Sequence, residues 1–291
     1  MKALAFGEIL WDVNGNEKTI GGAPLNVLAH IRRLGGESSI VSAVGSDELG
    51  RASLACLEDF GIADQYVRIS PFSTGRADVV LENGIPSYEF NMPCAWDDIR
   101  LSDDQYADLF NDEFSVFIYG TLAQRCLTSA LTLGKLLDDV SAAEFFFDVN
   151  LRGNFYNEKS IERGLEKATI IKMNDEELPV VASLLGTGKD SLIRWLFDNT
   201  CVRKVLVSAG SRGSFCHEKG GQVYHAQASD VSVIDTVGAG DSLSAAFLYF
   251  LSQGMDTRGA LEKASVLADY VVTKRGAVPE YDEGLKKRLS L

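Results

Sequence analysis

The sequence predicts an α/β protein in which a doubly wound, mostly parallel sheet carries helices on both faces. Short apolar runs alternate with segments of helical period through most of the 291 residues. Strands that alternate with helices favour right-handed βαβ units and a parallel sheet. No internal repeat or Pro/Ser-rich linker divides the chain, so we expect a single domain over residues 1–291.

The predicted strands are short apolar runs at residues 2–7, 39–44, 115–119, 144–149, 169–172, 204–208 and 231–234. The first predicted helix places Val27, Leu28, Ile31 and Leu34 on one face and ends at Gly35–Gly36. A later helix is predicted after residue 238, where apolar residues again follow helical spacing.

One stretch breaks this alternation. Between Tyr66 and Phe90 the chain shows strand-like runs without helical period, and two of them flank Asn83–Gly84, a strong hairpin signal. Residues 9–20 are also poor in helical pattern. We therefore expect a small inserted β lid, built from about residues 9–20 and 66–92.

Charge and composition exclude several classes of protein. The chain has 28 Lys+Arg and 41 Asp+Glu, so its formal charge is −13, which disfavours nucleic acid and anionic membranes as partners. Glu8 and Asp12 interrupt the N-terminal apolar stretch, and no signal peptide or membrane-spanning run is expected. Five scattered cysteines without CxxC spacing indicate reduced thiols and a cytoplasmic location.

The most informative motif is DTVGAGD at residues 235–241, between a predicted strand and a predicted helix. The turn at Gly238, Ala239 and Gly240 leaves backbone amides accessible, and a helix N-terminus attracts anions. The motif therefore suits a phosphate group. Taken alone, it fits equally well a plain turn followed by Asp241 as a helix-capping acid.

Two other phosphate motifs fail on inspection. Residues 186–190 read GTGKD, but Asp190 stands where a P-loop has the Ser or Thr that binds magnesium, so this stretch is expected to be a plain helix connection. A dinucleotide fingerprint would require a third glycine where Leu243 stands. A nicotinamide-dependent dehydrogenase is therefore disfavoured.

A second glycine motif, GGAPLN at residues 21–26, opens the first predicted helix. Gly21 and Gly22 would let a ligand approach the backbone, and Asn26 could offer an amide to a hydroxyl group. Glu8 and Asp12 flank the end of the first predicted strand, where ligand sites of α/β proteins gather. Alone, this motif too fits a simple turn before a helix.

Together, GGAPLN, the NDEE run at residues 174–177 and DTVGAGD resemble, in order and separation, the ribokinase-like (PfkB) carbohydrate kinase family across essentially the whole chain. GEILWD, GGAPLN and DVNLR (residues 148–152) are most similar to bacterial fructokinases. The resemblance implies transfer of the ATP γ-phosphate to fructose, giving fructose 6-phosphate. A kinase of the same family for 2-keto-3-deoxygluconate, ribose or a nucleoside is the alternative. From a different class, a non-catalytic sugar-binding regulator is also considered.

The resemblance also implies residue roles. Asp241 would be the base that takes the proton of the acceptor hydroxyl, and the backbone of Gly238, Ala239 and Gly240 would hold the γ-phosphate. This suits phosphoryl transfer, which depends on positioning and charge stabilisation. The sugar would contact a set of polar and glycine residues near the first helix and the DVNLR run: Asp12, Gly21, Gly22, Asn26 and Arg152.

The nucleotide and ion positions follow from the same resemblance. ATP would meet Asn174, Ser208, Gly210, Gly213 and Ser265, with adenine against the small residues Ala264, Ser265 and Ala268. Glu177 would organise Mg²⁺ through water. The family commonly binds a monovalent cation such as K⁺, and Asp235, Val237 and Gly276 occupy the matching positions. Lids in this family often pair between subunits, which implies a homodimer through the lid.

Four further residues are interpreted mainly as structural. His30 is expected to pack within the first helix rather than to act in catalysis. Trp11 suits either stacking on a sugar or anchoring the lid. Cys94 and Trp96 follow the predicted hairpin, where a structural role is favoured over contact with the sugar.

Overall fold

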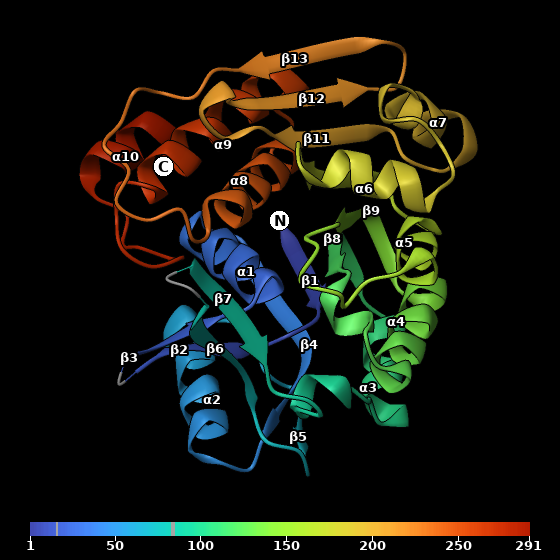
Figure 1. Cartoon of the computed structure of the whole chain (residues 1–291), viewed down its shortest axis with the longest axis vertical. Helices are drawn as coiled ribbons and strands as arrows, with labels where there is room; N and C mark the ends of the chain where they lie inside the picture. Colours follow the sequence, from blue (N-terminus) through green and yellow to red (C-terminus); the bar gives the residue numbers. More distant parts are fainter. Residues whose placement is uncertain (16, 83–84) are drawn as a thin grey trace.

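The computed structural model describes residues 1–15, 17–82 and 85–291, and its centre is a nine-stranded sheet with helices on both faces (Figure 1). The strand order is β13–β12–β11–β10–β9–β8–β1–β4–β5. All neighbours from β11 to β5 pair parallel, whereas the β11–β12 and β12–β13 pairs are antiparallel. The predicted doubly wound, mostly parallel architecture is confirmed. The strands are β1 (Lys2–Phe6), β4 (Glu37–Gly45), β5 (Val67–Ser70), β8 (Glu113–Gly120), β9 (Ser141–Asp148), β10 (Ile170–Asn174), β11 (Lys204–Ser208), β12 (Ser214–Glu218) and β13 (Gln222–Ala226).

Two sets of helices cover the two faces of this sheet. One face carries α1 (Ala23–Arg33), α2 (Glu48–Phe60), α8 (Ala239–Ser252), α9 (Thr257–Val271) and α10 (Glu283–Leu289). The other face carries α3 (Asp103–Phe110), α4 (Leu127–Asp139), α5 (Glu158–Leu165), α6 (Glu177–Leu184) and α7 (Leu192–Asn199). Within the described residues, no helix combines the length and the apolar character that crossing a bilayer requires.

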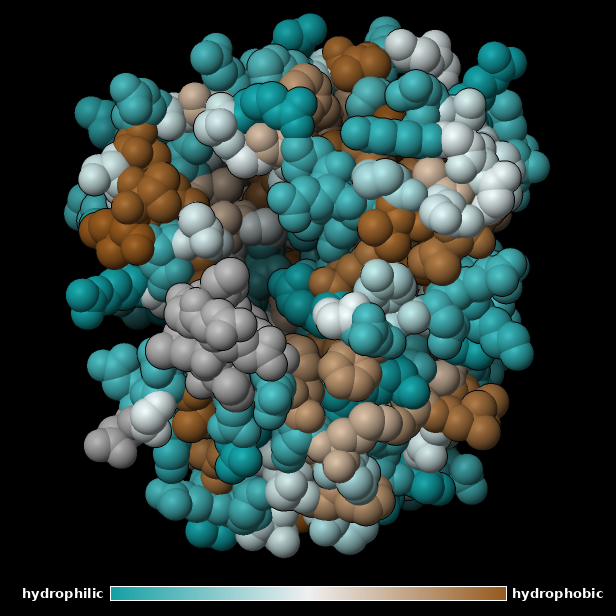
Figure 2. Space-filling view, viewed as in Figure 1, coloured by the Kyte–Doolittle hydropathy of each residue, from teal (hydrophilic) through white to brown (hydrophobic). Residues whose placement is uncertain are grey.

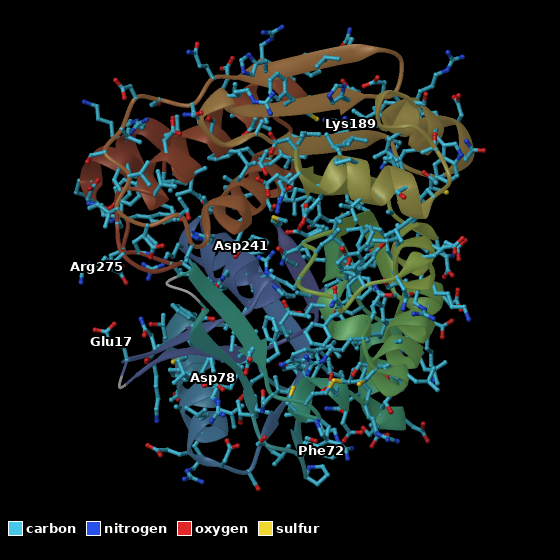
Figure 3. All side chains as sticks on the ribbon, viewed as in Figure 1. Glu17, Phe72, Asp78, Lys189, Asp241 and Arg275 are labelled. Carbon is cyan, nitrogen blue, oxygen red and sulfur yellow. The ribbon has the colours of Figure 1, made fainter. Side chains whose placement is uncertain are left out.

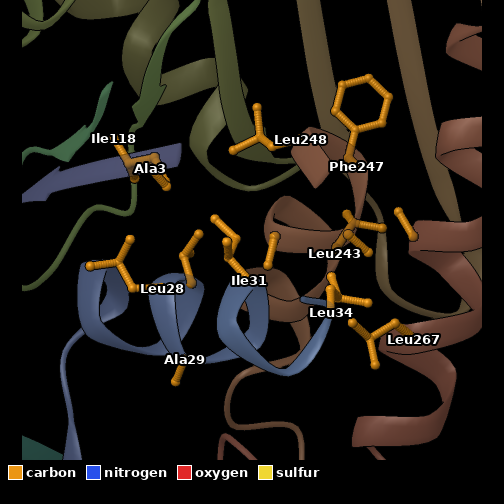
Figure 4. Close-up of a cluster of buried hydrophobic side chains, with 14 of the residues drawn as sticks. Ala3, Leu28, Ala29, Ile31, Leu34, Ile118, Leu243, Phe247, Leu248 and Leu267 are labelled. Atoms are coloured by element: carbon orange, nitrogen blue, oxygen red, sulfur yellow. The ribbon is translucent and has the colours of Figure 1, made fainter. Parts of the chain in front are cut away.

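Side-chain alternation along the central strands explains the two cores. In β1, Ala3 and Ala5 belong to one buried cluster, whereas Leu4 and Phe6 belong to the cluster on the opposite face. A strand buried on both faces therefore has a continuous apolar sequence. Figure 4 shows the first cluster, in which side chains of α1 such as Ile31 meet those of α8 between the sheet and α9.

A second, four-stranded sheet stands beside the main one, in the order β3–β2–β6–β7 (Figure 1). Its strands are β2 (Leu10–Asn14), β3 (Glu17–Gly21), β6 (Gly75–Glu82) and β7 (Ile85–Phe90). The hairpin turn predicted at Asn83–Gly84 lies outside the described residues, but β6 and β7 pair antiparallel, with Glu82 opposite Ile85. Both segments assigned to the lid therefore contribute strands to this sheet.

Two predictions about strands were wrong. Residues 67–70, assigned to the lid, form β5 in the main sheet, because α2 connects β4 to β5 as a parallel βαβ unit. Residues 231–234 form no strand: the Ile234 amide donates to the Val272 carbonyl at the end of α9, and the Val233 and Ile234 side chains are exposed. Helix α8 nevertheless begins directly after Gly238, as predicted.

Candidate active site

A cleft of about 520 Å³ opens at the carboxyl ends of β1, β9, β10 and β11, next to the four-stranded sheet. Ligand sites of open α/β sheets lie at this edge. Figure 2 shows the surface hollowed near the middle of the molecule, and Figure 3 places Asp241 at this central position, with Lys189 of the rejected P-loop far above it. Most predicted site residues line the cleft: Asp12, Gly21, Gly22, Asn26, Arg152, Asn174, Ser208, Val237, Gly238, Gly240 and Asp241.

The glycine turn before α8 forms one wall of the cleft. Gly238 has φ 78°, a left-handed conformation that favours glycine, and it caps the N-terminus of the 14-residue helix. A Cβ at Gly238 would lie 2.5 Å from the carbonyl oxygen of Ala277. The turn thus presents bare backbone at the positive end of a long helix, which can bind an anion.

Asp241 follows this turn and lies half-buried at the floor of the cleft. The side-chain amide of Asn26 donates a hydrogen bond of 2.8 Å to its Oδ2. Burial raises the pKa of Asp241 above its ordinary 3.8, and this outweighs the lowering by the Lys172 ammonium and by the Asn26 hydrogen bond. A carboxylate with a raised pKa is a stronger proton acceptor than an exposed aspartate.

A buried ion pair lies beneath the glycine turn. The Lys172 ammonium contacts both carboxylate oxygens of Asp148, at 3.1 and 3.2 Å, and both residues are less than one-tenth exposed. Burial alone would lower the pKa of Lys172, but nearby carboxylates, Asp148 first, raise it above 10.5. The Nζ atom also lies 3.0 Å from the position of a Cβ built on Gly240. Lys172 therefore stays protonated behind the anion-binding turn, with Asp148 as its counter-charge.

Glu8 and Asp12 add two further acidic groups to the lining of the cleft. Glu8 is 3% exposed and accepts a hydrogen bond of 3.2 Å from the Ala23 amide, and burial raises its pKa to about 7. Burial also raises the pKa of Asp12, while the Arg152 guanidinium opposes the shift at both acids. These groups can bind several hydroxyls of a neutral polyol.

Close contact with the backbone of Glu8 requires a glycine at position 22. Gly22 has φ 117°, and a Cβ there would lie 2.3 Å from the Glu8 carbonyl oxygen. This leaves the N-terminus of α1 open toward the cleft, one turn before Asn26.

Asn174 and Glu177 bind each other's backbone at the end of β10. Asn174 Oδ1 accepts from the amides of Glu176 and Glu177, at 3.0 and 2.8 Å. The two Glu177 carboxylate oxygens accept from the amides of Leu151 and Asn174, both at 2.7 Å. Asn174 lines the cleft, whereas Glu177 lies buried beneath it and ties β10 to the DVNLR run.

Three residues that were predicted to bind the nucleotide, Gly210, Gly213 and Ser265, do not line the cleft. Gly210 and Gly213 lie in the turn after β11, which follows Ser208. Ser265 is 6% exposed on the buried face of α9. Ala239 lies in the first turn of α8, between two lining glycines.

The three positions predicted for a monovalent cation lie next to one another. Asp235 accepts hydrogen bonds from the amides of Val237 and Gly276, at 3.0 and 3.1 Å. Among the described residues, no cluster of three or more His, Cys, Asp or Glu side chains is arranged as a metal site.

The structural interpretations of the lid residues agree with their positions. Cys94 and Trp96 are fully buried and do not line the cleft. Trp11 donates from Nε1 to the hydroxyl of Ser53 at 2.9 Å, so it anchors β2 to α2.

Sequence reasoning gave no role to several residues that line or support the cleft: Phe90, Asn150, Lys172 and Thr236. One of them, Lys172, carries a signal in the sequence. Lys172 is a single charged residue within a buried apolar strand, IIKMN, which is costly unless paired. Asn150 has φ 37°, an uncommon conformation for a residue with a side chain, and this only the structure reveals.

A doubly wound α/β fold, an anion-binding glycine turn and an adjacent carboxylate define a class of enzyme that transfers a phosphoryl group to a hydroxyl. Comparison with known proteins narrows the class. Residues 2–283 match the pfkB family of carbohydrate kinases, so the chain belongs to this family and is a sugar kinase.

Individual relatives differ in the acceptor that their names state. The chain is 28% identical, over 94% of its length and 74% of the relative, to a probable chloroplastic fructokinase-6 of Arabidopsis thaliana. It is 26% identical to a 5-dehydro-2-deoxygluconokinase of Bacillus velezensis, over 94% of this chain and 89% of the relative.

A solved structure shows the same fold. The fructokinase of Xylella fastidiosa with bound ATP aligns with a TM-score of 0.84 over 95% of this chain and 94% of that protein, at 23% sequence identity. At this identity the likeness supports the fold and not the substrate.

Proposed function

We propose that this chain transfers the γ-phosphate of ATP to a sugar hydroxyl, and that its substrate is fructose, which becomes fructose 6-phosphate. The observation that carries the proposal is the position of Asp241, held by Asn26 and adjoining the Gly238–Gly240 turn, in the same cleft as Asp12. A base, an anion site and a polyol site thus share one cavity.

The reaction follows from these positions. Asp241 takes the proton of the acceptor hydroxyl as its oxygen forms a bond to the γ-phosphorus, and the bond to the β-phosphate oxygen breaks to release ADP. The backbone amides of Gly238, Ala239 and Gly240 stabilise the charge on the transferring group, with the Lys172 ammonium behind them. The four-stranded sheet would exclude water and so limit ATP hydrolysis.

The acceptor side suits a neutral sugar. Asp12 and Asn26 offer carboxylate and amide partners for hydroxyls, and the Gly21–Gly22 backbone permits close approach. Arg152 lies at the same place and can bind a hydroxyl or the transferring phosphate. The fructokinase relative supports fructose. The 5-dehydro-2-deoxygluconokinase relative supports a keto acid as the acceptor, a class that also includes the alternative 2-keto-3-deoxygluconate; the carboxylate of such an acid would pair with Arg152.

ATP would extend from the glycine turn toward the end of β11, where Ser208 and the backbone of Gly210 and Gly213 could meet the phosphates and ribose. Mg²⁺ fits as an ion that enters with ATP, held mainly by phosphate oxygens and water. Glu177 would act on Mg²⁺ through water and not as a direct ligand, because both of its carboxylate oxygens already accept backbone hydrogen bonds.

Three further proposals rest on the family resemblance. K⁺ would bind near Asp235, Val237 and Gly276, and replacing K⁺ by a larger organic cation in the assay would test this.

The protein would act in the cytoplasm, on sugar and ATP. Two copies would pair through the four-stranded sheet, and sedimentation can measure this.

The test of the main proposal is ADP production from ATP and Mg²⁺ across a panel of sugars, keto acids and nucleosides, with a blank that lacks acceptor. Fructose-dependent ADP release above every other acceptor supports the full proposal. Greater activity with 5-dehydro-2-deoxygluconate or another acceptor refutes fructose and keeps the phosphoryl transfer. No activity from folded protein that binds ATP supports the non-catalytic regulator instead.

A further inference from the structure

His30 is fully buried on α1, and both of its ring nitrogens have partners. Nδ1 lies 2.7 Å from the Tyr281 hydroxyl, and Nε2 lies 2.9 Å from the carbonyl oxygen of Ala277. A carbonyl oxygen can only accept, so Nε2 carries the hydrogen and Nδ1 accepts from Tyr281. Burial lowers the pKa of His30 to about 4, and the ring is therefore neutral at physiological pH.

The Ala277 carbonyl that His30 holds packs directly against the glycine turn. It lies 2.5 Å from the position of a Cβ built on Gly238, and Ala277 itself lines the cleft. The preceding residue, Gly276, donates its amide to Asp235 at 3.1 Å. The backbone of residues 276–277 thus supports the DTVGAGD motif at two points, Asp235 and Gly238.

Helix α1 contacts the same turn at a second point. Asn26 and His30 are four residues apart and therefore lie on the same face of α1. Asn26 donates to the Asp241 carboxylate, while His30 donates to the carbonyl behind Gly238. Helix α1 thereby contacts the Gly238–Asp241 segment on two sides: Asn26 bonds to Asp241 in the cleft, and His30 bonds to the Ala277 carbonyl behind Gly238.

We infer that His30 is a positioning residue: its Nε2–H···O bond to Ala277 holds the Gly238–Gly240 turn at the distance from Asp241 that phosphoryl transfer requires. The inference rests on the proposed function. It adds a role for a residue that touches neither substrate, and it links the C-terminal segment to the anion-binding amides.

The C-terminal segment has other attachments, so losing the His30 bond should affect Ala277 locally. Tyr281 packs edge-on against Tyr270, with ring centroids 6.4 Å apart, and the Tyr270 hydroxyl donates to the Glu280 carbonyl at 2.7 Å. Arg33 forms an ion pair with Glu280. These contacts lie beyond Ala277 and do not involve its carbonyl.

Two polar substitutions separate the two His30 bonds. In His30→Gln the amide nitrogen takes the place of Nε2 and can still donate to Ala277. In His30→Asn the shorter amide takes the place of Nδ1 and keeps only the Tyr281 side. Tyr281→Phe is the complementary control, because it removes the hydroxyl and leaves the Nε2–H bond.

The kinetic test compares these variants with the best acceptor found in the panel. We expect His30→Asn to lower kcat by about tenfold to a hundredfold, as a displaced reacting group would. KM for the sugar and the Kd for ADP should change by less than about twofold, because those contacts lie elsewhere. His30→Gln and Tyr281→Phe should retain kcat within about threefold, the effect of a modest change in hydrogen bonding.

A loss of kcat in His30→Gln as large as in His30→Asn would refute the inference, and so would an unchanged kcat in His30→Asn. Hydrogen exchange gives a readout without activity: amides of residues 237–241 should exchange faster in His30→Asn than in His30→Gln. Equal exchange in the two variants would refute the positioning role. An inactive wild-type protein with this exchange difference would instead refute only the proposed function.

Discussion

Replacing Asp241 by asparagine removes the proposed base while preserving the shape of the cleft. The new amide can turn its oxygen toward Asn26 and keep the 2.8 Å hydrogen bond. A positioned base contributes typically 10²–10⁴-fold to such a reaction. This corresponds to about 3–5.5 kcal/mol of activation free energy, at about 1.4 kcal/mol per tenfold change in rate.

The same substitution should not destabilise the fold. Burial raises the pKa of Asp241 above 3.8, so the folded state disfavours the charged form relative to the unfolded chain. The stability linked to this group is fully present below pH 3.8 and is lost as the pH rises through the raised pKa. A neutral amide avoids that loss, and the thermal midpoint of Asp241→Asn at pH 7 should equal or exceed that of the wild type.

The assay measures kcat by acceptor-dependent ADP release and the thermal midpoint on the same preparations. Asp198→Asn is the matched control, since Asp198 is 62% exposed and its carboxylate pairs only with exposed Arg194 among the described residues. As the pH is lowered, the wild-type kcat/KM should fall when Asp241 becomes protonated. The midpoint of this fall should lie above pH 3.8, because burial raises the pKa of Asp241. Wild-type kcat in a folded Asp241→Asn variant would refute the assignment of the base.

Three further outcomes are expected. Lys172→Met leaves the Asp148 carboxylate buried without its cation and should lower the free energy of unfolding by about 3–5 kcal/mol, measured by denaturant titration. Burial raises the pKa of Glu8 from 4.5 in the unfolded chain to about 7 in the folded protein. The free energy of unfolding should therefore fall by roughly 3 kcal/mol as the pH rises between these values. Glu8→Gln removes the titrating group and should flatten this pH dependence from about pH 5 to 7.5. Gly238→Ala places a methyl against the Ala277 carbonyl and should reduce kcat by about a hundredfold.

Each of these has a matched comparison. Arg194→Met breaks an exposed pair and should cost less than about 1 kcal/mol, so an equal cost for Lys172→Met would contradict the reasoning. Gly186→Ala shares a positive φ but meets open space, and it should keep kcat. A Glu8→Gln profile that falls with pH as steeply as the wild type would assign the slope to another group.

Local sequence patterns predicted much of the architecture because they follow directly from chain geometry. Continuous apolar runs such as residues 115–119 become strands buried on both faces, and the spacing of Val27, Leu28 and Ile31 becomes the buried face of α1. The pattern failed at residues 231–234, where the amides of Ile234 and Asp235 bond to the Val272 carbonyl after α9 and not to a strand. It also misassigned residues 67–70, because a short strand carries no mark of the sheet it joins.

The sequence by itself determined the fold class, the family motifs and the glycine turns, because these depend on residue types at fixed spacing along the chain. Only the tertiary structure decided which side chains meet across long separations. Asn26 reaches Asp241, Lys172 reaches Asp148 and His30 reaches Ala277, and nothing in their local sequence specifies these partners. The physical reason is that burial and charge at the cleft arise when β9, β10, α1 and α8 pack together, and those contacts set the pKa of Asp241 and the position of the anion-binding turn.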